Sequence, residues 1–259
     1  MNINGKTILL TGASTGIGKA LAYQFAKERV NLALAARRIE LLEDLKNELI
    51  QLNSNILIQK CDVGKKSDVI NAYNIIKEKF AGVDIAILNA GVGHYMNVEK
   101  YDSGFAEDIY GANLFGIFYW LEQLLPDFLK RKEGIIAGVS SLADNRGYSG
   151  SSFYSSSKAA LTNYLEGLRV ELYPYGVKVI TVRPGFVKTP MTSTNKFCMP
   201  YLMSPDKAAS IIIDGIKKQK RVIQFPWQMV LLTNIVGLLP GGFYEALAKR
   251  QFKKLKKEK

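Results

Sequence analysis

A tyrosine and a lysine in the segment YSSSK have types and spacing that suit acid–base chemistry. Tyr154 and Lys158 are four residues apart, so their side chains would share one face of a helix. A lysine cation near a phenol favours the phenolate and lowers a phenol pKa that starts at about 10. Such a tyrosine can exchange a proton with a carbonyl oxygen near neutral pH. Alternatively, the two are ordinary surface residues one helical turn apart. The pair alone does not decide between an acid–base role and this interpretation.

The glycine-rich segment TGASTGIG lies between a short apolar run and a helical pattern. Its glycines allow a tight turn and a close approach of the backbone to a pyrophosphate at the start of the helix. Free N–H groups and the helix dipole favour negative charge there. We therefore expect a dinucleotide to bind here rather than a plain strand-to-helix turn. The expected contacts are Gly12, Ser14, Thr15, Gly16, Ile17 and Gly18.

Two arginines follow the second predicted strand and indicate which dinucleotide binds. An acidic residue at this point would bond the ribose 2′-OH of NAD and repel a 2′-phosphate. This chain has Arg37 and Arg38 instead, and no acid before Glu40. Since an arginine can form a bidentate pair with a phosphate, we expect NADP(H), with NAD(H) less favoured. The alternative is a solvated arginine pair at the start of a helix.

Together with five further segments, these motifs resemble the short-chain dehydrogenase/reductase family in its single-domain branch. The further segments are CDV, LNAG, GANLFG, VSS and PGFVKTP, and the ordered set covers residues 5–189. One departure is Leu88, where the family often has a second asparagine. The resemblance implies a Rossmann fold and a nicotinamide cofactor.

The resemblance also implies a catalytic tetrad of Asn113, Ser141, Tyr154 and Lys158. Tyr154 would be the general acid/base, and Lys158 would lower its pKa and bind the nicotinamide ribose. Ser141 would hydrogen-bond the substrate oxygen, and Asn113 would hold a water in the proton relay. Asp62 and Val63 would border the adenine, Asn89 would stabilise the sheet, and Thr189 would contact the carboxamide. The implied cofactor contacts outside the glycine loop and the arginines are Asp62, Val63, Asn89, Ala90, Gly91, Tyr154, Lys158, Pro184, Gly185, Val187 and Thr189.

Apolar strands that alternate with helical patterns must position these residues. The predicted strands cover residues 7–11, 31–36, 56–58, 83–88, 134–139 and 177–182. Helical spacing follows in 16–29, 41–49 and 69–76, then in 103–130 and 153–173. Continuous apolar strands between helices indicate a parallel sheet covered on both faces. We expect one doubly wound α/β Rossmann domain: residues 1–225 bind NADP(H) and carry catalysis, and 226–259 are its apolar and basic helical extension.

Composition excludes several classes of protein. The 259 residues are 47% hydrophobic and 22% charged, a globular balance that argues against a disordered or fibrous chain. Two cysteines give no disulfide framework and one histidine gives no metal cluster, so we expect no metal site. The start of the chain lacks a signal-peptide pattern, and a reducing cytoplasmic location is expected.

The charge is concentrated at the carboxyl end. Residues 249–259 contribute six units of the net charge of +12, and their only aromatic residue is Phe252. Nucleic acid is therefore not an expected partner. The apolar residues of 244–259 lie near helical spacing with basic residues opposite. This pattern fits an interfacial helix on the anionic inner face of a membrane, and equally a subunit-packing helix with a solvated tail.

An uncharged stretch, residues 222–244, precedes this tail and is long enough for a membrane span. Pro226, Pro240 and several polar residues argue against a span, and the family resemblance implies that this region closes the substrate pocket. Apolar side chains in 186–203 also suggest a hydrophobic or lipid-like substrate.

The expected function is reduction of a ketone or aldehyde, or oxidation of a secondary alcohol, with NADP(H). The cofactor would transfer the hydride and Tyr154 the proton. The resemblance implies a small-molecule substrate and a homodimer or homotetramer. The alternative is a catalytically idle protein that senses NADP(H) or serves as a membrane-associated scaffold, and the complete tetrad favours the enzyme.

Overall fold

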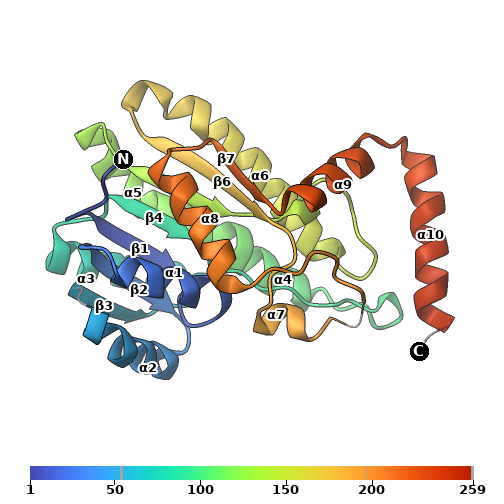
Figure 1. Cartoon of the computed structure of the whole chain (residues 1–259), viewed down its shortest axis with the longest axis horizontal. Helices are drawn as coiled ribbons and strands as arrows, with labels where there is room; N and C mark the ends of the chain where they lie inside the picture. The colour runs from blue at the N-terminus through green and yellow to red at the C-terminus, as the bar shows by residue number, and fades with distance from the viewer. Residues whose placement is uncertain (53–54, 196, 258–259) are drawn as a thin grey trace.

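A parallel sheet forms the centre of the computed structural model, which describes residues 1–52, 55–195 and 197–257, with side chains of the last helix given up to Arg250 and for Phe252. Within these residues the sheet has seven strands in the order β3-β2-β1-β4-β5-β6-β7 (Figure 1). Their bounds are β1 Thr7–Thr11, β2 Asn31–Ala36, β3 Asn55–Lys60, β4 Ile85–Leu88, β5 Ile135–Val139, β6 Lys178–Pro184 and β7 Val222–Phe225. The predicted doubly wound α/β fold is confirmed.

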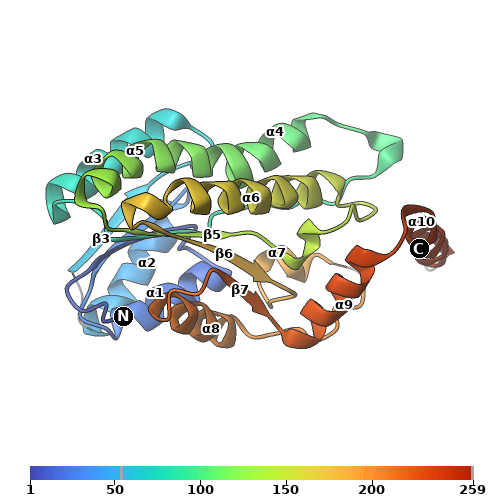
Figure 2. The same cartoon turned by 90° about the horizontal axis from the view of Figure 1, so that it is seen from above.

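Helices cover both faces of the sheet, as Figure 2 shows. One face carries α1 Gly16–Ala26, α2 Ile39–Leu49 and α8 Pro205–Lys217. The other carries α3 Lys66–Phe80, α5 Gly116–Arg131 and α6 Ser152–Glu171, with α4 Gly104–Tyr110 leading into α5. A separate apolar core fills each interface, because the side chains of each strand point alternately to the two faces.

The strands β1 and β2 begin and end where the sequence predicts, because each is a continuous apolar run. Elsewhere the boundaries differ. The strand β3 extends to residues 55–60 because it pairs with the whole of β2. The helix α1 ends at Ala26 rather than at residue 29, and the next residues turn back toward β2.

Two features differ from the expectation more clearly. The helical region predicted over 103–130 is interrupted by a π-helical turn, Gly111–Phe115, which separates α4 from α5. The uncharged stretch 222–244 begins with the edge strand β7, which has alternate buried and exposed residues and pairs with β6. Four alternating residues are too short a pattern to stand out from a longer apolar run.

The rest of the uncharged stretch forms α9 Trp227–Leu238 and the start of α10 Gly241–Lys257, with Leu239 and Pro240 between them. In Figures 1 and 2, α10 projects away from the sheet and its flanking helices. Across the described parts of the chain, no helix combines the length and apolarity needed to cross a membrane.

Candidate active site

Tyr154 and Lys158 lie one turn apart in α6, as their spacing predicts. Tyr154 is half-buried and hydrogen-bonded to Ser141. Lys158 is buried, and its Nζ donates at 2.8 Å to the carbonyl of Val139, which is the last residue of β5. The same Nζ lies 5.8 Å from the centre of the Tyr154 ring. The helix thus brings a phenol, a serine hydroxyl and an ammonium group together at the carboxyl end of the sheet.

Burial decides the protonation of this pair. It raises the pKa of Tyr154, and the hydrogen bond from Ser141 opposes that rise only in part. It also lowers the pKa of Lys158 to about 8, against the opposing charge of Asp144. In this structure the pKa of Tyr154 rises rather than falls, since desolvation of the phenolate outweighs the hydrogen bond from Ser141. A protonated Tyr154 at neutral pH is suited to donating its proton.

Asn113 lies in the π-helical turn and is completely buried. Its Oδ1 accepts the N–H of Val92 at 2.8 Å, and its Nδ2 donates to the carbonyl of Val92 and to the hydroxyl of Ser157, both at 3.0 Å. A Cβ on Gly91 would lie 2.9 Å from Oδ1 of Asn113 and 3.3 Å from Nζ of Lys158. The absent side chain of Gly91 therefore lets the loop after β4 approach Asn113 and Lys158.

Ser141 begins the short turn Leu142–Asp144 (η4), and its Oγ accepts the N–H of Ala143 at 3.1 Å. A buried ion pair holds the other end of this turn. Arg183 of β6 donates to both carboxylate oxygens of Asp144, at 2.5 and 2.7 Å. Thr162 of α6 donates to Asp144 at 2.6 Å and shares a hydrogen bond of 2.7 Å with Ser140. The turn that carries Ser141 is thus fixed to α6 and β6.

The glycine-rich loop joins β1 to α1, and its glycines have the conformations and spaces that only glycine supplies. Gly12 and Gly16 have φ of +66° and +57°. A Cβ on Gly12 would lie 2.8 Å from Cα of Ala90, and one on Gly18 would overlap the carbonyl oxygen of Gly12. Thr15 precedes α1 without a side-chain cap, so the first N–H groups of the helix stay available to an anion. Ser14 is buried, and Ile17 is half-buried against the core.

The loop after β4 is bound to the glycine-rich loop. The hydroxyl of Thr11 accepts the N–H groups of Asn89 and Ala90, both at 3.0 Å. The amide of Asn89 donates to the carbonyls of Thr11 and Gly12 at 3.0 and 3.3 Å. Asn89 therefore joins β1 to β4 at the carboxyl edge of the sheet.

Arg37 and Arg38 are both exposed at the carboxyl end of β2. Among the described residues, no side-chain hydrogen bond or ion pair involves either arginine. Asp62 and Val63 follow β3. One oxygen of Asp62 accepts the N–H of Gly64 at 3.1 Å, and Val63 is buried.

The segment after β6 returns to the glycine-rich loop. Pro184 ends β6, and the N–H of Gly185 donates to the carbonyl of Phe225 at 2.7 Å. Val187 is buried and forms a bridge with Met203. Thr189 caps the short helix α7 Pro190–Ser193, and its methyl group would lie 2.9 Å from a Cβ on Gly16. Of the predicted residues in this segment, the structure thus brings Thr189 beside the glycine-rich loop, while Gly185 lies against Phe225 and Val187 against Met203.

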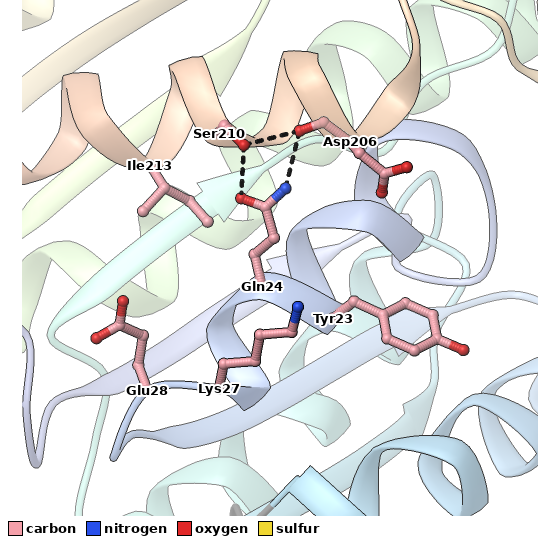
Figure 3. A pocket seen from close by; sticks show the side chains of 7 residues that line it. All are labelled: Tyr23, Gln24, Lys27, Glu28, Asp206, Ser210 and Ile213. Carbon is pink, nitrogen blue, oxygen red and sulfur yellow. Dashed lines mark hydrogen bonds between the residues drawn. The ribbon is translucent and has the colours of Figure 1, made fainter.

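A surface groove lies apart from these residues, between α1 and α8 (Figure 3). Gln24 donates to the carbonyl of Asp206 at 2.8 Å, and Ser210 donates to Gln24 at 3.2 Å. These hydrogen bonds cross from one helix to the other. The groove therefore lies over a polar contact between α1 and α8.

The comparisons with known proteins agree with this architecture. A family model described as short chain dehydrogenase matches residues 6–197. The chain belongs to the short-chain dehydrogenase family. An uncharacterized oxidoreductase of Myxococcus xanthus is 36% identical over 245 residues, which are 95% of this chain and 97% of that protein. This short-chain dehydrogenase is therefore an oxidoreductase.

Two further relatives carry more specific names. An NADP-dependent 3-hydroxy acid dehydrogenase of Schizosaccharomyces pombe is 30% identical over 236 residues, which are 85% of this chain and 90% of that protein. The crystal structure of a 3-ketoacyl-(acyl-carrier-protein) reductase from Brucella melitensis, complexed with NADH, is 26% identical with a TM-score of 0.79. It covers 86% of this chain and 97% of that one.

Sequence reasoning missed the ion pair of Asp144 and Arg183, which lie 39 residues apart. The signal available was Arg183 near the end of the mainly apolar run VKVITVRP, since a charge that a strand carries into the core needs a partner. It also missed that Gly93 faces the tyrosine: a Cβ there would lie 3.2 Å from the Tyr154 ring and 3.6 Å from Sδ of Met191.

Proposed function

We propose that the protein is an NADP(H)-dependent oxidoreductase that reduces a ketone or aldehyde, or oxidises a secondary alcohol, with Tyr154 as general acid/base. The observation that carries this proposal is the cluster of half-buried Tyr154 with buried Ser141 and Lys158, beside the loop of Gly91. Gly91 follows Ala90, which approaches Gly12, so one continuous edge runs from the glycine-rich loop to the tyrosine.

The cofactor site fits a dinucleotide because its loops pack so closely that only glycine is accommodated there, and the first N–H groups of α1 stay available to a phosphate. Gly12, Gly18 and Gly91 all stand where a side chain would meet backbone or polar atoms. When bound, a nicotinamide cofactor supplies or accepts the hydride. We assign its phosphates to the glycine-rich loop and the start of α1, and the remaining predicted contacts to the loops after β3, β4 and β6.

The chain's own residues carry the proton. Tyr154 donates its proton to the substrate oxygen during reduction, and Ser141 hydrogen-bonds the same oxygen. Lys158 supplies positive charge beside the tyrosine and binds the nicotinamide ribose. Asn113, already bonded to Val92 and Ser157, holds a water in the proton relay.

Cofactor choice and substrate class are the finer parts of the proposal. Exposed Arg37 and Arg38 at the end of β2 favour NADP(H), and the name of the 30% identical relative supports that choice. Met191 near the tyrosine, and Phe186 packed 5.9 Å from Phe197 between ring centres, favour a hydrophobic or lipid-like substrate.

The proposal also covers the surroundings of the enzyme. Residues 1–225 are the catalytic part and 226–259 their extension within one domain. The protein acts in the cytoplasm as a homodimer or homotetramer, and residues 244–259 contact an anionic membrane. The last two of these residues, and the side chains of 251 and 253–257, lie outside what the structure describes.

The test is to follow NADPH and NADH oxidation against a panel of ketones, aldehydes and 3-oxoacyl thioesters of increasing chain length. We expect turnover with NADPH and rising kcat/KM with apolar length. Binding of NADPH without turnover of any carbonyl compound would instead support an idle NADP(H) sensor.

A further inference from the structure

Helix α9 has an apolar face that the described protein leaves uncovered. Met229 and Thr233 are buried against the body. The side chains on the other side, at spacings of three or four residues, are Trp227, Leu231, Ile235 and Leu238, and they are 52% to 86% exposed. A helix on the surface of a globular protein normally turns such a stripe toward the core. A contiguous exposed apolar face of this kind marks an interaction site.

Exposed apolar side chains recur in the first turns of α10. Phe243 and Leu247 are one turn apart and are 57% and 43% exposed. Arg250 follows three residues later and is exposed, as is Lys249. Between Arg221 and Glu245 the sequence has no charged residue, whereas residues 249–259 hold an excess of six positive charges. An uncharged apolar surface therefore borders a strongly basic segment.

We propose that α9 and the first turns of α10 form a docking surface for an anionic lipid bilayer. The apolar face lies at the boundary of headgroups and acyl chains, and Lys249 and Arg250, which begin the basic segment, face the lipid phosphates. Trp227 has the amphipathic ring that is enriched at this depth. The inference deepens the proposed function by naming the membrane-facing element, which the sequence placed only in 244–259.

A bilayer fits the charges better than a second copy of the chain. In a two-fold interface the same patch meets itself, which would bring two basic segments to one interface. Like charges so placed oppose association, whereas anionic headgroups attract both the segment and its apolar neighbour.

The position of α9 connects this surface with the active site. Arg146 donates to the carbonyls of Val236 at 3.2 Å, Gly237 at 3.0 Å and Leu239, at the carboxyl end of α9. Arg146 lies five residues after Ser141, and Figure 2 shows α9 at the same end of the molecule as the start of α6. A hydrophobic substrate dissolved in the bilayer would thus be supplied beside Ser141 and Tyr154.

Co-sedimentation of the full chain with vesicles tests the surface. We expect binding to mixed phosphatidylglycerol–phosphatidylcholine vesicles at low salt, weaker binding at high salt, and little binding to pure phosphatidylcholine. Trp120 is buried and Trp227 is 71% exposed, so a blue shift of tryptophan emission on binding reports Trp227.

Matched variants locate the contact. The double change Leu231→Gln with Ile235→Gln should weaken vesicle binding by about tenfold or more, because two apolar side chains no longer enter the lipid. The control, Val98→Gln with Val170→Gln, alters two side chains that are 68% and 72% exposed elsewhere and should bind as the unchanged protein does.

Two results would overturn the inference: no binding of the intact chain to anionic vesicles at low salt, or equal losses of binding in both double variants. The first result can be accompanied by a dimer that only the α9 variant dissociates. Such a dimer would assign the face to a second copy. Carbonyl reduction, measured without vesicles, is independent of these results. An inactive protein that still binds vesicles would contradict the proposed function alone.

Discussion

Burial raises the pKa of Tyr154 and so keeps its hydroxyl protonated at neutral pH. A desolvated phenol stays protonated at neutral pH and is ready to donate to a carbonyl oxygen. Lys158, with a pKa lowered to about 8, is still mainly a cation at neutral pH and loses its proton in mild alkali. Both groups depend on one carboxylate, Asp144, whose charge opposes the loss of either proton.

Replacement of the tyrosine by phenylalanine removes the hydroxyl group that would donate the transferred proton and keeps the aromatic ring. We expect Tyr154→Phe to lower kcat by about 10²–10⁴-fold while the Kd for NADPH, from fluorescence titration, stays nearly unchanged. Tyr164→Phe in the same helix is the control and should keep full turnover. Near-normal activity of Tyr154→Phe would exclude the assigned role.

A carboxylate in place of Arg37 should reverse the attraction for a 2′-phosphate. A charge-assisted hydrogen bond contributes about 1.5–3 kcal/mol, so Arg37→Asp should raise the Kd for NADPH by about 10- to 100-fold and that for NADH far less. Lys79→Asp, at the far end of α3, controls for net charge. Equal affinity of the unchanged protein for the two cofactors would refute the preference.

Neutralising Asp144 should move the alkaline limb of the activity profile to lower pH. Its charge raises the pKa of both Tyr154 and Lys158, so Asp144→Asn should lower both, whichever group carries the limb. The measurement is kcat/KM against pH for each protein, normalised to its own maximum. Thr162→Val removes one hydrogen bond to Asp144 without changing charge and should leave the limb in place. An unmoved limb in Asp144→Asn would show that this charge does not act on the pair.

At the scale of the elements, Arg146 holds the carboxyl end of helix α9. The guanidinium of Arg146 donates to the carbonyls of Val236 and Gly237 in the last turn of the helix, and the carbonyl of Val236 also accepts the N–H of Leu239. We expect Arg146→Ala to raise the rate of amide hydrogen exchange in α9 by about tenfold or more, since loss of a charge-assisted bond costs about 1.5–3 kcal/mol. Exchange in β1 and β4 should not change, and Lys220→Ala, an exposed site before β7, should leave α9 as it is. Unchanged protection of α9 in Arg146→Ala would show that other contacts hold the helix.

The elements that the sequence predicts well are those with a continuous local signal. The run TILLT is followed by Gly12 and the run NLALAA by Arg37, and neither residue continues a buried strand. The strands β1 and β2 therefore have the predicted bounds. The π-helical turn at Asn113 has no comparable signal, because its geometry comes from the packing of Asn113 against Val92 and Ser157. The spacing of Tyr154 and Lys158 predicts their shared face, but not the burial that sets their pKa values.

The contacts that sequence reasoning could not supply are those between distant segments. Asp144 and Arg183 meet across β5 and β6, and Arg146 reaches a helix that begins 81 residues later. Only the order of the strands brings such residues together. Motifs therefore predicted the composition of the candidate site, whereas its supporting contacts required the fold.

For the whole molecule, cofactor binding should appear as a gain in thermal stability. A ligand present at about 100 times its Kd stabilises the native state by about 2.7 kcal/mol, which corresponds to about 5–10 °C in Tm for a chain of this size. We expect this shift with NADPH in differential scanning calorimetry, and a smaller one with NADH at the same concentration. Gly18→Val, whose Cβ would overlap the carbonyl oxygen of Gly12 and displace the glycine-rich loop, should abolish the shift. A shift that persists in Gly18→Val would place the cofactor elsewhere.

The strand order has a consequence for how the chain folds during synthesis. After β1, each new strand pairs with one already made: β2 with β1, β3 with β2, β4 with the free side of β1, and then β5, β6 and β7 in turn. A chain leaving the ribosome from its amino end can thus extend the sheet outward without waiting for a later strand. The apolar helix α9 follows the same order, because it emerges after Arg146, the residue that binds its last carbonyls, is already in place.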